Sequence, residues 1–252
     1  MKDCVIVVPM YKYELSDYER ISYHSIFNKL GDDYDIVAIC GESFDIEKFY
    51  IDNNVNIYKF TNIVTFDDKY FTSINSYNDL CLTNDLYKPF INDYKYILIA
   101  QIDCLILSNQ LKKFIDKNLY YIGSPIVWPD TVDTLIDYPT GRYYNGGFSL
   151  RNLEFFNTVT LNKFLINSYT KRNIKDEDFI YSAIIQTRYP NNPTFVDAMS
   201  FCMDDCLGYS FSVTEGMMPF AVHHFYNDTN KGDNLYHIQH FGWYDIDKDV
   251  EL

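Results

Sequence analysis

Short, continuously apolar runs alternate with helical patterns over the first 125 residues, and this alternation limits the folds open to the chain. A strand that is buried on both faces is apolar throughout. The runs with this character are residues 3–9, 34–40, 55–60, 96–102 and 120–123. The helical patterns between them cover residues 16–30, 45–50, 73–90 and 111–117. Strands joined through helices form right-handed crossovers and a mostly parallel sheet. We therefore expect an α/β fold whose N-terminal half is a Rossmann-like sheet with helices on both faces.

The predicted strand ends mark where a ligand would bind. Parallel α/β sheets bind ligands just outside the carboxyl ends of their strands. Residues 9–12, residues 40–42 and Asp103 all lie at the carboxyl ends of predicted strands. The first half of the chain should therefore form a pocket large enough for a nucleotide.

The second half of the chain is less regular. Residues 125–145 contain Pro, Gly and Asp without periodicity, which predicts a long surface loop. NGGFSLR, residues 145–151, predicts a tight glycine turn that leads into a strand, and helical patterns follow at 153–169 and 177–189. We find no repeat and no linker, so we expect one domain over residues 1–252. Its C-terminal segment, from Met217, carries four of the five histidines.

Net charge excludes several classes of partner. The chain carries a formal charge of −14, which repels nucleic acid and anionic lipid surfaces. An anionic substrate would need local neutralisation, either by a metal ion or by helix N-termini. No apolar run is long enough to span a membrane, and the charged start resembles no signal peptide. With six scattered cysteines, we expect free thiols in a reducing cytoplasm.

Two motifs could contact a diphosphate. Gln101 and Asp103 are two residues apart at a predicted strand end, so they should share a face. A carboxylate there can bind a divalent cation that bridges a diphosphate. Asn145, Gly146 and Gly147 would allow close approach of the backbone to a ligand. The structural alternatives are that Asp103 only opens a turn and that the glycines form an ordinary turn.

Two further groups could take part in catalysis or metal binding. Glu177 and Asp178 follow Asp176 at the start of a helical pattern. They could supply a general base at a cleft, or the three carboxylates could simply cap the helix and complement its dipole. His223 or His224 could be a metal ligand, although a histidine at either position could also be structural.

Taken together, these motifs resemble those of nucleotide-sugar glycosyltransferases of the GT-A fold. More narrowly, they resemble a family known mostly as a domain of unknown function with predicted glycosyltransferase activity. The matching segments occur in the family's order over nearly the whole chain. They are VVPMYK with Glu19 and Ser22, Tyr77-Asn78 with Leu80, YILIAQIDCLI, YIGSP, NGGFSLR, EDF and PFAVHHF.

The resemblance implies a donor site built on residues 1–125 and an acceptor site built on residues 126–252. In place of an Asp-x-Asp metal motif the chain has Gln101-Ile-Asp103, so the first carboxylate is missing. Asp103 and His223 would hold a divalent cation, and a nitrogen ligand would favour Mn²⁺ over Mg²⁺. We prefer His223 to His224 because the family's histidine lies three residues after a Pro-Phe-small segment. In addition, adjacent residues of an extended segment point to opposite faces.

The remaining site residues also follow from the resemblance. Those expected to bind the nucleotide sugar are Pro9, Met10, Tyr11, Gln101, Asp103, Asn145, Gly146 and Gly147. Pro9, Met10 and Tyr11 would contact the base and ribose of a UDP- or GDP-sugar. Asp178 would be the general base and Glu177 an acceptor contact. The acceptor would be a glycan or another hydroxyl compound, in polysaccharide or glycoconjugate synthesis.

Two other interpretations stay open. A nucleotidyltransferase shares a Rossmann-like start, but it would need a glycine-rich loop after the first strand, and PMYKYELS has no glycine. A non-catalytic carbohydrate-binding protein on a degenerate transferase fold would explain the missing carboxylate.

Overall fold

A six-stranded, mostly parallel sheet organises the computed structural model, which describes residues 1–125, 144–171, 174–204, 207–226 and 232–245. The strand order is β3-β2-β1-β4-β7-β6. The strands are β1 (Lys2–Met10), β2 (Asp35–Gly41), β3 (Asn62–Phe66), β4 (Tyr94–Ala100), β6 (Tyr121–Pro125) and β7 (Tyr144–Asn152). β1 pairs in parallel with β2 and β4, and β7 runs antiparallel between β4 and β6. The expectation of a mostly parallel α/β sheet is confirmed.

A second, smaller sheet lies beside the first and has the order β5-β9-β8. Its strands are β5 (Cys104–Ile106), β8 (Cys202–Met203) and β9 (Ala221–His223). β5 begins only four residues after β4 ends, so the chain passes directly from one sheet to the other. The sequence analysis identified none of these short strands.

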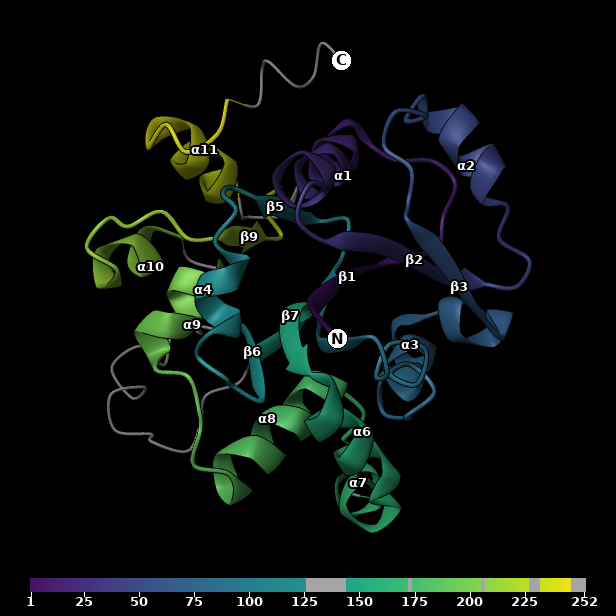
Figure 1. Ribbon diagram of the computed structural model, residues 1–252. Coiled ribbons are helices and arrows are strands. Elements are labelled where there is room, and N and C mark those ends of the chain that lie inside the picture. Colours follow the sequence, from purple (N-terminus) through teal and green to yellow (C-terminus); the bar gives the residue numbers. More distant parts are fainter. Residues whose placement is uncertain (126–143, 172–173, 205–206, 227–231, 246–252) are drawn as a thin grey trace.

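Helices lie on both sides of the large sheet, as Figure 1 shows for α1 on one side and α6 and α8 on the other. The helices of the first half are α1 (Asp17–Leu30), α2 (Ile46–Asn53), the 3-10 helix η1 (Asp68–Phe71), α3 (Ile74–Cys81) and α4 (Leu111–Ile115). Those of the second half are α6 (Leu153–Leu161), α7 (Lys163–Thr170), α8 (Glu177–Arg188), α9 (Phe195–Phe201), α10 (Leu207–Val213) and α11 (Gly232–His240). The predicted start of α1 is confirmed, because Ser16 and Glu19 form a complete capping box.

The prediction of a third strand at residues 55–60 is wrong, because the strand lies at β3 instead. Val55 and Phe60 are buried, but Ile57 between them is 82% exposed, and turn hydrogen bonds join Val55 to Tyr50 and Tyr58 to Val55. β3 is an edge strand in which no residue is fully buried, so no apolar run marks it. Burial of two side chains in a connecting segment therefore gave a misleading strand pattern.

Three other boundaries differ from the sequence prediction. The helix predicted at 73–90 ends at Cys81, and hydrogen-bonded turns follow as far as Tyr94. The helix predicted at 153–169 is two helices that meet at Asn162, whose side chain caps the second. The glycines of NGGFSLR lie within β7 rather than in a turn before it. The loop predicted at 125–145 lies outside the described residues except at its ends.

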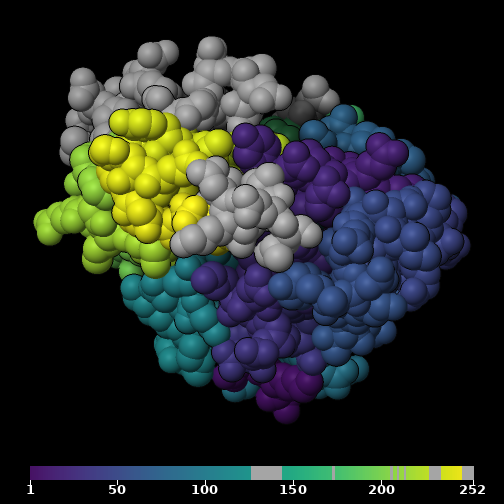
Figure 2. All heavy atoms as spheres, turned by 90° about the horizontal axis from the view of Figure 1, so that it is seen from above, coloured from purple at the N-terminus to yellow at the C-terminus, as the bar shows by residue number. Residues whose placement is uncertain are grey.

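The C-terminal elements pack against α1. A small apolar cluster joins Ile21 of α1 to Leu105 of β5, Val222 of β9 and Ile238 of α11. Figure 2 shows α11, in yellow, on the same face of the molecule as the purple N-terminal residues. No helix in the described part of the chain is long and apolar enough to cross a membrane. The five described cysteines are free and buried.

Candidate functional site

The candidate site lies where the chain leaves the large sheet for the small one. Asp103 occupies the turn between β4 and β5, closed by a hydrogen bond from the Cys104 N–H to the Gln101 carbonyl. β5 pairs antiparallel with β9, and this register sets Cys104 opposite His223. Asp103 and His223 are 120 residues apart in sequence, and the pairing of two three-residue strands brings them together.

Two histidines share Asp103. Its Oδ1 lies 3.3 Å from Nε2 of His223, and its Oδ2 lies 3.3 Å from Nε2 of His224. The two imidazole rings are 3.8 Å apart between centroids. One donor atom from each of these three residues lies within 4.8 Å of the others, which is the separation expected of ligands to one metal ion.

Asp204, just after β8, holds the same two rings from the other side. Its Oδ2 is 3.2 Å from Nδ1 of His223, and its Oδ1 is 3.0 Å from Nδ1 of His224. The Asp204 side chain is almost fully buried. Sequence analysis missed this residue because nothing about its neighbours suggested a site.

The rings of His223 and His224 lie side by side, although adjacent residues of an extended segment were expected to point to opposite faces. His224 has a φ of +49°, so the chain leaves the extended conformation immediately after β9. This left-handed turn brings the His224 ring round beside that of His223. The geometry therefore gives no reason to prefer His223 alone.

The electrostatics of the cluster follow from its alternation of charges. Burial lowers the pKa of His223, but Asp103 and Asp204 outweigh burial and raise it to about 10. Burial raises the pKa of both carboxyls, but the two imidazoles outweigh it and leave each pKa below its usual value. In the absence of metal, the cluster therefore favours charged carboxylates beside a protonated His223.

The residues fit a divalent cation. His223 Nε2 is buried, and it lies 3.3 Å from Asp103 Oδ1 without forming a well-aligned hydrogen bond to any described atom. Gly147 of β7 adjoins this nitrogen, and a Cβ there would lie 2.6 Å from His223 Nε2 and 2.5 Å from Gln101 Oε1. Gln101 therefore lies on the same side of Gly147 as the cluster, although β4 has already ended. A carboxylate and imidazole nitrogens facing one point form a typical transition-metal donor set.

β7 connects this cluster to the acidic start of α8. Asn145 donates from Nδ2 to Asp204 Oδ2 over 3.2 Å, and its Oδ1 accepts from the Gly147 N–H at 2.7 Å. The N–H of Gly146 donates to Asp178 Oδ2 over 3.1 Å. Asp178 is only partly buried, and it lies next to the glycine segment.

Glu177 was expected to contact the acceptor, but its side chain is buried and paired with Arg151. It is buried, and its Oε1 accepts from Arg151 Nη2 at 2.7 Å. Arg151 is fully buried and also donates to the Gly146 carbonyl and to the Tyr87 and Ser149 hydroxyls. A Cβ at Gly146 would overlap Glu177 Oε1. Through Arg151, Glu177 therefore helps to hold the backbone of β7 at Gly146. Arg151 was visible in NGGFSLR as a charge ending an apolar strand, but its role was missed.

The three residues expected to bind the nucleotide at the end of the first strand are not equivalent. Pro9 and Met10 are buried within β1, where they pair with Ile39 and Cys40, so the expected ligand contact of the Met10 side chain is not possible in this conformation. Tyr11 is 54% exposed. Burial and the charges of Asp103 and Glu19 raise the pKa of Tyr11, so its ring lies near the candidate site.

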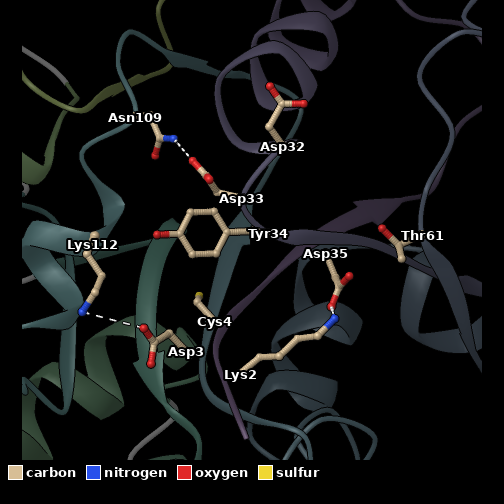
Figure 3. Close-up of a pocket in the computed structure, with 11 residues that line it drawn as sticks. Lys2, Asp3, Cys4, Asp32, Asp33, Tyr34, Asp35, Thr61, Asn109 and Lys112 are labelled. Carbon is tan, nitrogen blue, oxygen red and sulfur yellow. Dashed lines mark hydrogen bonds and ion pairs between the residues drawn. The ribbon is translucent and has the colours of Figure 1, made fainter.

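A cavity of about 780 Å³ lies at the opposite edge of the sheet, beside the first residues of β1 and β2. Figure 3 shows that its charged groups are largely matched: Lys112 pairs with Asp3, Lys2 with Asp35, and Asn109 with Asp33. This cavity shares no residue with the cluster around Asp103, and its charges suit a solvated surface hollow.

Comparisons with known proteins agree with this architecture. A family model described as "Protein of unknown function (DUF5672)" matches residues 60–223. No curated protein sequence matches the chain. Galactosyltransferase LgtC, solved with donor and acceptor sugar analogues, aligns with a TM-score of 0.61 and 14% identity over 94% of this chain and 95% of its own. Mouse xyloside xylosyltransferase 1 aligns with a TM-score of 0.59 and 13% identity over 91% of this chain and 99% of its own. The glycosyltransferase GlyE of Streptococcus pneumoniae aligns with a TM-score of 0.53 and 12% identity over 99% of this chain and 62% of its own. The chain has the GT-A fold.

Proposed function

The chain belongs to the DUF5672 family of proteins of unknown function, and we propose that it is a metal-dependent glycosyltransferase. It would move a sugar from a nucleoside diphosphate to a hydroxyl acceptor. One observation carries the proposal: Asp103 and His223 converge at the carboxyl edge of a GT-A sheet, directly against the side-chain-free backbone of Gly147. Ligands of parallel α/β sheets bind at this edge.

In this proposal residues 1–125 form the donor half and residues 126–252 the acceptor half of a single domain. Tyr11 is exposed, unlike Pro9 and Met10, and would contact the base or ribose. Asn145, Gly146 and Gly147 would line the donor-sugar pocket, where the small glycines let Gln101 and His223 pack close to the backbone of β7. The donor would be a UDP- or GDP-sugar, and the setting would be polysaccharide or glycoconjugate synthesis in the cytoplasm.

Asp103 and His223 would hold the cation, and Gln101 would lie beside the bound diphosphate. A divalent cation in this position supplies neutralisation of the charge that develops on the departing diphosphate. The strongly acidic chain supports this role, because an anionic diphosphate needs local neutralisation.

Asp178 would accept the proton of the acceptor hydroxyl as that oxygen attacks the anomeric carbon. Its Oδ2 already accepts the Gly146 N–H, which fixes the carboxylate against the proposed sugar pocket. Glu177 would act indirectly, through its ion pair with Arg151 beneath Gly146.

Calorimetry with UDP and GDP tests donor binding. Affinity should depend on Mn²⁺ and should fall when EDTA is added. Equal affinity with and without EDTA would exclude the metal dependence.

A panel of nucleotide sugars tests catalysis. With Mn²⁺ and no acceptor, a transferase should hydrolyse its donor slowly, whereas a non-catalytic carbohydrate-binding protein should not. Release of pyrophosphate from a nucleoside triphosphate would instead support a nucleotidyltransferase.

A further inference from the structure

We infer that His224 is a third metal ligand in place of the missing first carboxylate, and that Asp204 is the positioning residue for both histidines. The centre would then be one carboxylate and two imidazoles, with a preference for transition-metal ions such as Mn²⁺ and Co²⁺ over Mg²⁺ and Ca²⁺. This inference rests on the proposed function for the location of the metal site, but it concerns metal binding and can be tested without a sugar donor.

The geometry of the donor atoms supports three ligands to one ion. Two ligands at right angles, each about 2.1 Å from a metal, are about 3 Å apart. Both distances from Nε2 to the nearer Asp103 oxygen are 3.3 Å, one on each oxygen. The left-handed conformation of His224 is what makes this arrangement possible. The Nδ2 of the buried Asn234 of α11 donates to the His224 carbonyl over 3.3 Å and to the Asp204 carbonyl over 3.2 Å, which helps to fix this turn.

Asp204 determines which nitrogen of each ring is available. Each of its oxygens lies within 3.2 Å of one Nδ1, so each ring can donate a hydrogen bond from Nδ1–H to this carboxylate. The Nε2 lone pairs are then left facing Asp103. Such an outer carboxylate orients metal-bound histidines and increases their basicity. Asp204 is itself held by Asn145 and is almost fully buried, so it has little freedom to turn away.

The donor types determine which metals this centre should prefer. Mg²⁺ and Ca²⁺ favour oxygen ligands. Imidazole nitrogen favours divalent transition metals over Mg²⁺ and Ca²⁺, and it binds Co²⁺ more strongly than Mn²⁺. Replacing a carboxylate by His224 also removes one negative charge from the centre, which weakens its attraction for hard cations further. An Asp-x-Asp motif would have the opposite tendency.

Mn²⁺ binding to the metal-free full-length protein tests the inference. Electron paramagnetic resonance measures free Mn²⁺, and spin-echo modulation by nitrogen reports how many imidazoles are bound. We expect two nitrogens in the wild type and no displacement by a large excess of Mg²⁺. His224→Ala should leave one nitrogen and weaken Mn²⁺ binding at least 10-fold. His240→Ala is the matched control, because this histidine is exposed on α11. It should bind as the wild type does.

Asp204→Asn separates orientation from ligation. The amide keeps the size of the side chain but cannot accept from both rings, and loss of such an outer partner typically weakens metal binding about 10- to 100-fold. Both nitrogens should still be detected, at higher Mn²⁺ concentration. Since Asp204 is buried, the circular-dichroism melting curve of each variant shows whether it is folded, and His224→Ala, at a partly exposed position, remains informative if Asp204→Asn does not fold.

Two results would overturn the inference: one nitrogen in the wild type, or unchanged Mn²⁺ affinity in His224→Ala. Failure of the proposed function would look different. A protein that binds Mn²⁺ through two nitrogens but binds no nucleoside diphosphate would retain this centre and lose the glycosyltransferase assignment.

Discussion

At the scale of single residues, the candidate centre is two imidazole rings held between two carboxylates. Asp103 faces both Nε2 atoms and Asp204 both Nδ1 atoms. The two carboxylates differ in exposure, since the Asp103 side chain is 27% exposed and that of Asp204 only 4%. The more exposed carboxylate is the one that a metal and a diphosphate could reach, so substitutions at Asp103 and Asp204 should have different effects.

Asp103→Asn should leave the fold intact and abolish turnover. The side chain is partly exposed in a turn and the amide is isosteric, so the melting temperature should change little. Loss of the metal-binding carboxylate removes stabilisation of the leaving diphosphate, typically several kcal/mol. Donor hydrolysis and calorimetric Mn²⁺ binding measure the effect, with the exposed Asp116→Asn as control. Wild-type rates in Asp103→Asn would mean that the metal is held elsewhere or not used.

Asp178→Asn should reduce transfer to acceptor at least about 100-fold, because general-base catalysis is typically worth that much. Donor binding should hardly change. If Asp178 only complements the helix dipole, the variant should instead lose about 0.3–1 kcal/mol of stability and keep its turnover.

Asp176→Asn is the matched control, because Asp176 is the N-cap residue but makes no capping hydrogen bond through its side chain. Proton NMR of the product must accompany these assays. An enzyme that retains the anomeric configuration would tolerate Asp178→Asn better than one that inverts it.

At the scale of elements, β7 carries the largest share of the candidate site. Asn145, Gly146 and Gly147 lie along its first half and Arg151 near its end. It is the antiparallel strand between β4 and β6, and its register with β6 shifts between Gly123 and Ser124. Arg151 of β7 pairs with Glu177 at the acidic start of α8, while Gly147 adjoins His223 of the candidate metal centre.

Gly147→Ala should mainly weaken Mn²⁺ binding, whereas Gly146→Ala should mainly lower the stability of the fold. In Gly147→Ala the new methyl group displaces His223 or Gln101, so Mn²⁺ affinity should fall more than stability. In Gly146→Ala the methyl group meets Glu177 at the buried ion pair, and such overpacking typically costs about 1–3 kcal/mol. Urea unfolding and Mn²⁺ titration of both variants provide the comparison. If both substitutions had equal effects on stability and on Mn²⁺ affinity, Gly147 would not adjoin the metal centre separately from the ion pair at Gly146.

At the scale of the whole molecule, the site lies at the junction of two sheets. The large sheet leads directly into Asp103 and the small sheet supplies His223, while an apolar cluster packs the small sheet against α1 and α11. A separate contact between distant parts of the chain is the Arg151–Glu177 ion pair, which links β7 to α8, while a hydrogen bond from Arg151 to the Tyr87 hydroxyl reaches the segment after α3. The junction depends on contacts between residues far apart in sequence.

Removing either partner of the buried ion pair should therefore be costly. Arg151→Met or Glu177→Gln alone should lower the free energy of unfolding by about 3–5 kcal/mol, because each leaves a buried group without its partner. The double variant should lose less than the sum of the single losses. Urea unfolding of all four proteins measures the coupling, and strictly additive losses would contradict it.

The same variants have a defined pH dependence. Burial raises the pKa of Glu177, and Arg151 and the neighbouring acidic residues modify this effect. A carboxyl group whose pKa in the folded state lies above its unfolded value of about 4.3 stabilises the fold most at pH values below about 4.3. This stabilisation is lost as the pH rises through the folded-state pKa. Arg151→Met should therefore lose stability as the pH rises from about 4, whereas the double variant should not show this loss.

The sequence by itself determined the parts of this protein whose information is local. Continuous apolar runs predicted β1, β2 and β4, and the capping box at Ser16 and Glu19 predicted the start of α1. Helices between these runs predicted the parallel sheet, which in turn predicted that Asp103 would lie at a ligand-binding edge. These features depend on periodicity and on hydrogen bonds between near neighbours, so one segment is enough to reveal them.

Only the tertiary structure decided how the site is assembled. β5, β8 and β9 have two or three residues each, which is too short for any periodicity, and their pairing alone brings His223 to Asp103. The position of the His224 ring depends on a left-handed backbone conformation that no residue type required. Asp204 and Arg151 became meaningful only when their partners were known. A buried charged group is stable only beside groups that compensate it, and here most of those groups come from distant parts of the chain.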